Sequence, residues 1–237
     1  MEASGYVTLS RQSGLMNEMR IVANNIANAA TNGYRQQGVV FSEFVQTAPD
    51  EPSLSMTRAQ ARNTSMAQGS LTRTGSAFDF AVEGEGFFLI ETPAGERLTR
   101  AGSFSPNAAG DLVTPDGFRV LDAGGAPVFI PPNVDVSVSA DGTMSADGLP
   151  IGQIGLFQPN DLLDLTREDG VMFRAGNGVQ PVESGRILQG FIEGSNVDPI
   201  LQVARMIEVQ RAYESGQSFL KSEDERIRTA LKTFTRT

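Results

Sequence analysis

The chain has 237 residues, of which 40% are hydrophobic, so it is long enough and apolar enough to form a substantial folded core. It contains no Cys and no His, which excludes disulfides, thiol nucleophiles, imidazole bases and the zinc sites built from these residues. The formal charge of -9 argues against nucleic acid and anionic membranes as partners, and we expect no catalytic residues, no cofactor and no metal.

The N-terminal segment, residues 1–35, is predicted to be a helix with one apolar stripe. Spacings of three and four place two seven-residue series on the same stripe of a helix. The first series is Leu9, Met16, Ala23 and Ala30, and the second is Gln12, Met19 and Ile26. The dipeptide Asn32-Gly33 then gives a stop and turn signal.

Two further segments precede the C-terminal region. Residues 36–73 are rich in Ser, Thr, Ala and Gln, which predicts an extended connector with little core of its own. Residues 74–192 consist of short extended runs separated by Gly, Asp, Asn and Pro, a pattern typical of β-hairpins. Only residues 160–165 suggest a helical turn. We therefore expect a central all-β domain of short antiparallel strands.

The C-terminal segment, residues 193–237, is predicted to hold a second and longer helix. Asp198-Pro199 is a helix start signal, with Asp as the cap and Pro in the first turn. An apolar row then recurs every seven residues at Met206, Tyr213, Leu220, Ile227 and Phe234. The predicted fold class is α+β, with long N- and C-terminal helices that form a coiled-coil-like pair, a central all-β domain of short antiparallel strands and an extended connector.

Three local motifs in the β domain have structural and chemical interpretations. Gly84-Glu85-Gly86 lacks the third glycine, the following helix and the Lys of a phosphate loop, which favours a tight turn. Asp141-Gly142 and Asp147-Gly148 lack the spacing of a calcium loop and favour hairpin turns. Glu83 and Glu85 share one face of a strand, so a secreted glycan-acting enzyme stays a remote alternative.

Charge and apolar area together predict that the terminal helices bind other protein surfaces. Residues 1–35 and 193–237 carry net charges of +1 and 0, whereas residues 36–192 carry -10. Two long, nearly neutral helices present more apolar stripe than one small β domain covers, and identical copies are the simplest partner. Amides on the stripes would fix register. The expected assembly interface is Leu9, Met16, Met19, Asn24, Asn25, Ile26, Asn28, Met206, Gln210, Tyr213, Leu220 and Ile227.

Several blocks of sequence, in order along the chain, resemble the signature motifs of flagellar rod and hook proteins. The N-terminal blocks are Asn24-Asn25-Ile26-Ala27-Asn28 and Thr31-Asn32-Gly33-Tyr34-Arg35. The central and C-terminal blocks cover residues 79–88, 98–104, 110–117, 193–199 and 206–214. The resemblance therefore spans both ends and the middle of the chain.

The resemblance implies a structural, non-enzymatic subunit of the bacterial flagellar basal-body rod, which polymerises into a helical tube that transmits torque from the motor to the hook. It implies copies of the chain and related rod proteins as partners, together with the ring bushing around the rod, and no direct membrane insertion. It also implies type III export to the periplasm without a cleaved signal peptide. The short length is most similar to a proximal rod subunit, with a distal rod or hook-type axial protein as the alternative.

Overall fold

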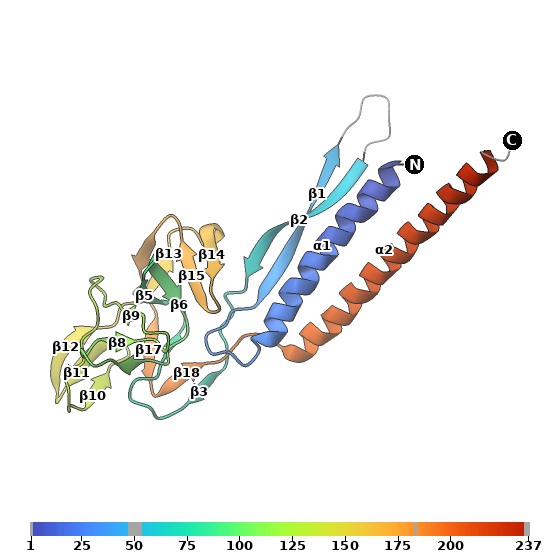
Figure 1. Cartoon of the computed structure of the whole chain (residues 1–237). Helices are drawn as coiled ribbons and strands as arrows, with labels where there is room; N and C mark the ends of the chain where they lie inside the picture. The colour runs from blue at the N-terminus through green and yellow to red at the C-terminus, as the bar shows by residue number, and fades with distance from the viewer. Residues whose placement is uncertain (1, 47–53, 183, 235–237) are drawn as a thin grey trace. The chain divides into compact units, whose positions relative to one another are not determined.

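The computed structural model describes residues 2–46, 54–182 and 184–234 (Figure 1). The chain forms two compact units. Unit 1 consists of Met1–Ala29, Gln36–Ser65 and Val197–Thr237, and unit 2 consists of Ala30–Arg35 and Met66–Asn196. A mainly β central region lies between two terminal helices in the sequence, so the predicted α+β class is confirmed at this level.

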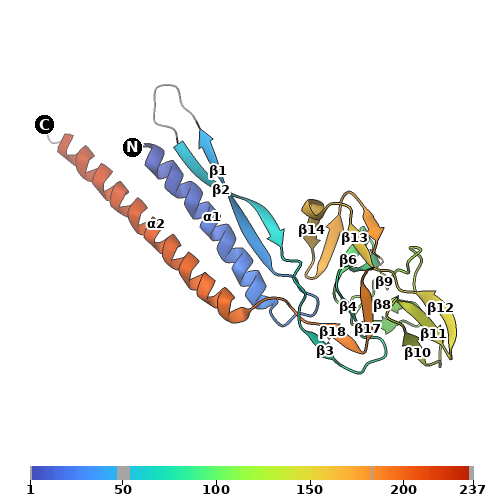
Figure 2. The ribbon, with the colours of Figure 1, turned by 180° about the vertical axis from the view of Figure 1, so that it is seen from behind.

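Unit 1 contains both helices and a two-stranded ribbon. Helix α1 spans Glu2–Ala27 and helix α2 spans Pro199–Phe234. Strands β1 (Gln37–Gln46) and β2 (Leu54–Thr64) pair antiparallel, with an irregularity between Val40 and Phe41. Helix α1 contacts the ribbon on one side and α2 on the other, and both views show the two helices side by side (Figures 1 and 2).

The helix boundaries follow the capping signals in the sequence. The Asp198 carboxylate accepts hydrogen bonds from the backbone N–H groups of Ile200 and Leu201 at 2.9 and 3.2 Å, which caps α2 as predicted. Helix α1 ends at Ala27, and Gly33 adopts a positive φ of 71°, which suits the predicted turn.

The expectation of a connector over residues 36–73 needs correction, because much of this segment is paired β-structure. Gln37 pairs with Thr64 at one end of the ribbon and Gln46 with Leu54 at the other. Its first half contains Val39, Val40, Phe41, Phe44 and Val45, residue types that favour strands. The abundance of small polar residues in the second half, which indicated a connector, is compatible with a strand once it has a partner.

Unit 2 contains the remaining strands and one short helix, and all of its strand pairs are antiparallel. In the described residues the largest sheet has the strand order β14-β15-β6-β5-β9-β8-β7. The elements are β3 (Leu71–Arg73), β4 (Phe80–Glu83), β5 (Phe88–Thr92), β6 (Gly95–Thr99), β7 (Ser105–Pro106), β8 (Leu112–Val113), β9 (Arg119–Val120), β10 (Val136–Val138), β11 (Thr143–Ala146), β12 (Leu149–Gln153), β13 (Phe157–Pro159), the 3-10 helix η1 (Leu162–Asp164), β14 (Leu165–Glu168), β15 (Met172–Ala175), β16 (Val179–Pro181), β17 (Arg186–Gln189) and β18 (Phe191–Glu193).

The core of unit 2 lies on both faces of β5. Phe88 and Ile90 belong to one buried apolar cluster, whereas Phe87 and Leu89 belong to another. Successive side chains of a strand point to opposite faces, so a continuous apolar run is expected where both faces are covered. This arrangement explains why the run from Phe87 to Ile90 shows no alternation with polar residues.

The glycine-rich motifs form turns, as predicted. Gly84 and Gly86 adopt positive φ between β4 and β5. Asp147 and Gly148 both have positive φ in the two-residue connection between β11 and β12, as a type I′ hairpin requires. Within the described residues, no helix is both long enough and apolar enough to cross a membrane.

Candidate assembly interface

The contact between α1 and α2 follows a seven-residue pattern on α2. Gln202 and Val209 are buried, and Gly216 occupies the next position of the same series. The predicted residues Met206 and Tyr213, which lie between these positions, and Leu220, which follows them, are half-buried. On α1 the buried positions are Gln12, Gly14, Glu18, Ile21, Val22 and Asn25.

Three polar contacts fix the antiparallel register of these helices. The Asn25 side-chain amide donates to Gln202 Oε1 at 3.1 Å, and Arg205 Nε donates to Glu18 Oε1 at 2.7 Å. Near the start of α1, the Gln12 side-chain amide donates to the Tyr213 carbonyl at 3.0 Å. A shift of either helix would separate all three pairs, so these contacts specify one alignment.

Asn25 also joins the helix pair to the ribbon. Its side chain donates to the Gln37 carbonyl at 2.8 Å and accepts from the Gln37 backbone N–H at 3.0 Å. The side chain is 1% exposed. Asn25 is therefore the amide that holds all three parts of unit 1 together. Of the other two asparagines predicted in this region, Asn24 is exposed, and the half-buried Asn28, which directly follows α1, donates to the Asn24 carbonyl.

The predicted interface residues fall into two groups in the structure. Met19, Ile26, Met206, Tyr213 and Leu220 are half-buried within unit 1. Leu9, Met16 and Ile227 are 56%, 44% and 46% exposed, and Gln210 is exposed. The first seven-residue series on α1 thus faces solvent, whereas the buried face uses residues such as Gly14 and Glu18. Periodicity identified a helix with several apolar rows but not the row that faces α2.

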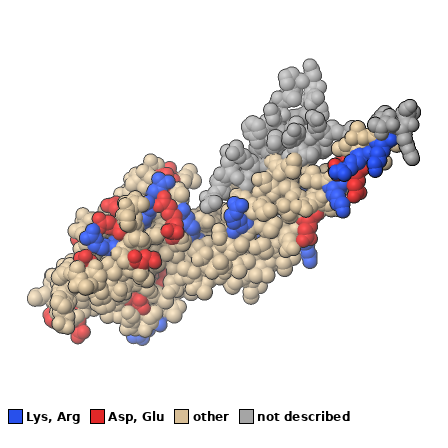
Figure 3. All heavy atoms as spheres, in the orientation of Figure 1, with Lys and Arg blue, Asp and Glu red and all other residues tan. Residues whose placement is uncertain are grey.

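Unit 1 consequently leaves apolar side chains exposed on both helices. Leu9 and Met16 lie one above the other on α1, and the start of α2 exposes Ile200, Val203 and Ile207. The face shown in Figure 3 is largely uncharged along the middle of unit 1, with charged atoms gathered towards the C-terminal end of α2. Exposed apolar side chains that are grouped on a helix in this way are typical of protein-binding surfaces.

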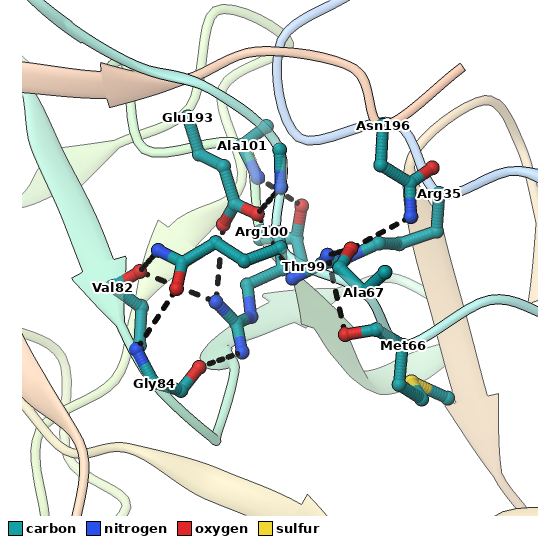
Figure 4. Close-up of polar contacts among 12 residues, drawn as sticks. Arg35, Met66, Ala67, Val82, Gly84, Thr99, Arg100, Ala101, Glu193 and Asn196 are labelled. Atoms are coloured by element: carbon teal, nitrogen blue, oxygen red, sulfur yellow. Dashed lines mark hydrogen bonds and ion pairs between the residues drawn. The ribbon is translucent and has the colours of Figure 1, made fainter. Parts of the chain in front are cut away.

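Unit 2 contains a buried ion cluster that sequence reasoning missed. The Glu193 carboxylate receives Arg35 Nη2 at 2.9 Å and Arg100 Nη1 at 3.0 Å, and these three side chains are between 1% and 4% exposed. Arg100 also donates to the carbonyls of Val82 and Gly84, while Arg35 donates to the Ala67 carbonyl (Figure 4).

Burial lowers the pKa of both arginines in this cluster. Desolvation lowers the pKa of the Arg100 guanidinium to about 10, although Glu193 favours its charged form. Desolvation likewise lowers the pKa of Arg35 against the opposing influence of Glu193. At neutral pH Arg35 and Arg100 stay protonated, so two guanidinium groups pair with the single carboxylate of Glu193.

Arg167 lies beside this cluster between two aromatic rings. Its guanidinium carbon is 4.3 Å from the centroid of the Tyr34 ring and 4.6 Å from that of Phe173, distances at which a cation is attracted to a ring face. The guanidinium also donates to the Arg35 carbonyl. Arg167 therefore fixes the backbone at the residue whose side chain enters the ion cluster.

The two carboxylates considered for catalysis, Glu83 and Glu85, are both exposed. Glu83 lies 3.9 Å from Arg186, with both side chains about half exposed, and Glu85 is exposed. A cavity of about 210 Å³ in unit 2 is lined by residues that include Ile90, Thr99 and Met172 but neither of these glutamates. Among the described residues, no three acidic side chains are grouped to hold a metal ion.

Comparison with known proteins gives the class of protein. Residues 81–146 match the family described as flagellar hook protein FlgE/F/G D1 domain, and residues 188–233 match the family described as flagellar basal body rod FlgEFG protein C-terminal. The chain is 38% identical to the flagellar basal-body rod protein FlgF of Caulobacter vibrioides, with 98% of each chain covered. The chain therefore belongs to the flagellar basal-body rod protein family and is a structural subunit of that rod.

Within the family the chain resembles FlgF more than FlgG. It is 39% identical to the FlgF protein of Mesorhizobium japonicum, with 97% of this chain and 98% of the relative covered. The corresponding identity to the FlgG protein of Bacillus subtilis is 32%, over 95% and 96%. These relatives are named as rod proteins, which are structural, and their names give no support to the glycan-acting alternative.

Proposed function

We propose that the chain is a subunit of the proximal rod that polymerises through unit 1 into a helical tube and transmits torque from the motor to the hook. The observation that carries this proposal is the exposed apolar surface on α1 and α2, which remains uncovered although the two helices already pack on each other. Head-to-tail contacts between such surfaces generate open helical assemblies. Copies of the chain and related rod proteins are the proposed partners.

In this proposal the two groups of interface residues have different roles. Met19, Met206, Tyr213 and Leu220 pack within the subunit, in a coiled-coil-like pair whose register is set by polar contacts. Leu9 and Met16 pack against a neighbouring subunit instead. Each large apolar side chain that becomes buried contributes roughly 1.5–3 kcal/mol, so a few such contacts suffice to drive association.

The exposed position of Met16 allows the proposal to be tested without disrupting the subunit. Met16→Asp places a charge on the exposed side of α1, and we expect it to abolish rod assembly in cells while the purified subunit keeps its helix content by circular dichroism. Ser13→Asp is the matched control, because Ser13 is exposed and already polar. Normal rods in the Met16→Asp strain would contradict the proposed interface.

A distal rod or hook-type role is the second candidate, favoured by the match to FlgG over 95% of the chain. A deletion strain separates the two roles, since loss of a proximal subunit halts the rod at an earlier stage than loss of a distal one. Electron microscopy of isolated basal bodies gives the length at which the rod stops.

We further propose type III export to the periplasm without a cleaved signal, and contact with the ring bushing through the acidic central region.

A further inference from the structure

Two members of the ion cluster, Arg35 and Glu193, lie in the parts of unit 2 where the chain passes to and from unit 1, and the third, Arg100, pairs with Glu193. The chain changes unit between residues 29 and 30, 35 and 36, 65 and 66, and 196 and 197. Arg35 is the last residue of its segment, and Glu193 lies three positions before the final crossing. We propose that these three residues form a brace that locks the crossing segments of unit 2 into one arrangement, so that mechanical load enters unit 2 through all of them together.

Each crossing segment is tied to Glu193 or to its neighbours. The Gly33 backbone N–H donates to the Glu193 carbonyl at 2.8 Å, and the Gly69 backbone N–H donates to Glu193 Oε1 at 2.9 Å. The Asn196 side-chain amide donates to the Ala67 carbonyl at 2.7 Å, and its backbone N–H donates to the Tyr34 carbonyl at 3.3 Å. The segments at 30–35, 66–69 and 193–196 are therefore bonded to one another.

The crossing segments also pack closely at two glycines. A Cβ atom on Gly33 would lie 2.2 Å from the backbone nitrogen of Ala101, and one on Gly69 would lie 2.1 Å from the carbonyl oxygen of Gly194. Neither gap admits a larger residue without moving backbone. The segment 66–69 is thus in close backbone contact with residue 194, and the segment 30–35 is in close backbone contact with residues 100–101, next to the ion cluster.

A buried ion cluster is expected to contribute more to a fixed geometry of the segments than to the free energy of unfolding. Removing charges from water costs as much as their attraction returns, so such clusters add little net stability, whereas loss of one partner leaves a charge buried and uncompensated. Charge-assisted hydrogen bonds to a guanidinium are directional, so they specify geometry. The Nε atoms of Arg35 and Arg100 have no hydrogen-bond partner in the described part of the chain, which again indicates that stability is not maximised.

The same unit contains a matched control with the same residue types. The Glu168 carboxylate receives Arg97 Nε at 2.7 Å and Arg174 Nε at 2.8 Å. The Glu168 side chain is 37% exposed, against 1% for Glu193. Glu168 is the last residue of β14 and is distant in sequence from the positions where the chain changes unit. The two carboxylates therefore differ in burial and in position along the chain, but not in the kind of partners.

The brace is tested in the free subunit by amide hydrogen exchange of Glu193→Gln, which keeps the side-chain size and leaves two guanidinium charges without a carboxylate. We expect exchange at Gly33, Gly69 and Asn196 to accelerate on the order of a hundredfold, with β5 and β6 amides unchanged. Glu168→Gln should change exchange at the crossing segments less than twofold. Unchanged exchange at the three amides, or equal acceleration in both variants, would overturn the brace.

A second variant keeps the test decisive if Glu193→Gln unfolds. Arg100→Met combined with Glu193→Gln restores the wild-type net charge of the cluster, so its crossing-segment amides should exchange at least tenfold more slowly than those of Glu193→Gln. If Glu193→Gln has no folded state, the double variant should still fold. A double variant that exchanges as fast as the single one, or that also fails to fold, would show that charge compensation is not what holds the segments.

The mechanical part of the inference rests on the proposed function, and a separate measurement tests it. Cells carrying Glu193→Gln should assemble rods, as judged by microscopy of basal bodies, and should lose rotation speed under high viscous load while Glu168→Gln cells do not. Normal rotation under load, together with altered exchange, would overturn the mechanical role and keep the proposed rod function. Failure of the wild-type chain to enter rods would overturn the proposed function instead and leave the exchange result standing.

Discussion

At the residue scale, buried polar groups determine how distant segments align. Asn25 and Glu18 pair with α2 residues that are 177 and 187 positions away in the sequence. Each is buried, and a buried polar group without its partner costs about 1–3 kcal/mol. Alternative alignments of the helices are therefore penalised by these few residues more strongly than by the apolar contacts, which tolerate small shifts.

A pH prediction concerns Tyr34. Burial raises the pKa of its phenol above the ordinary value of 10, while the charge of Arg167 acts in the opposite direction. The unfolded chain therefore ionises first as pH rises, so the stability contributed by Tyr34 is present below pH 10 and is lost as pH rises through the raised pKa. Ultraviolet titration of the phenolates should show a late-ionising phase that belongs to Tyr34.

The assignment is checked by comparing two variants. Tyr34→Phe should remove the late phase, whereas Tyr213→Phe, which removes a tyrosine from unit 1, should retain it. A late phase that persists in Tyr34→Phe would show that the buried ring is not its source.

The sequence identified some of these residues and missed others for a physical reason. The cap at Asp198 was predictable because its partners are two and three residues away. Asn25 was singled out as a register residue, yet its partner Gln202 was not. Glu18 and Glu193 were missed altogether. Their roles depend on arginines brought close by tertiary folding, and no local pattern records such a pairing.

At the element scale, the two faces of α2 differ in burial. Val209 is 2% exposed and Val203 is 47% exposed, although both lie on the same helix. Val209→Ala should lower the free energy of unfolding by about 2 kcal/mol, because it removes buried methyl groups and leaves a cavity. Val203→Ala should leave it nearly unchanged. Chemical denaturation followed by helical circular dichroism measures both.

We expect the direct effect on polymerisation to be larger for Val203→Ala than for Val209→Ala, which is the reverse of their effects on the free energy of unfolding. Val203→Ala removes apolar surface from the exposed face and should raise the protein concentration needed for polymerisation, whereas the fold of its subunit is intact. A Val203→Ala subunit that is destabilised as strongly as Val209→Ala would mean that the exposed face is covered within the subunit.

The helices were predictable as elements because seven-residue spacing and capping signals are local. The choice of the buried face was not, because the face against α2 contains the polar residues Gln12, Glu18 and Asn25. The ribbon was also missed: small polar residues dominate its second strand, and its pairing with β1 depends on a register that composition does not encode. The turns of unit 2 were recovered because Asp-Gly sequences need positive φ locally.

At the scale of the whole molecule, assembly should change which parts of the chain proteases reach. The end of α2 carries exposed Arg226, Arg228 and Lys232. In the free subunit we expect trypsin to cleave at these residues before it cleaves within unit 2. Polymerisation through unit 1 should protect them, and mass spectrometry of timed digests gives the order of cleavage. Equal cleavage of free and assembled protein would contradict burial of this helix end in the tube.

The pairing of α1 with α2 also determines when the chain becomes competent for assembly. Helix α1 is translated early, but Asn25, Glu18 and Gln12 acquire their α2 partners only after Gln202, Arg205 and Tyr213 have been added. A chain that terminates before Gln202 carries the exposed Leu9 and Met16 without the helix that holds them in register. Under the proposed assembly through unit 1, we expect such a fragment not to enter the polymer, because its α1 lacks the α2 partners that set its alignment.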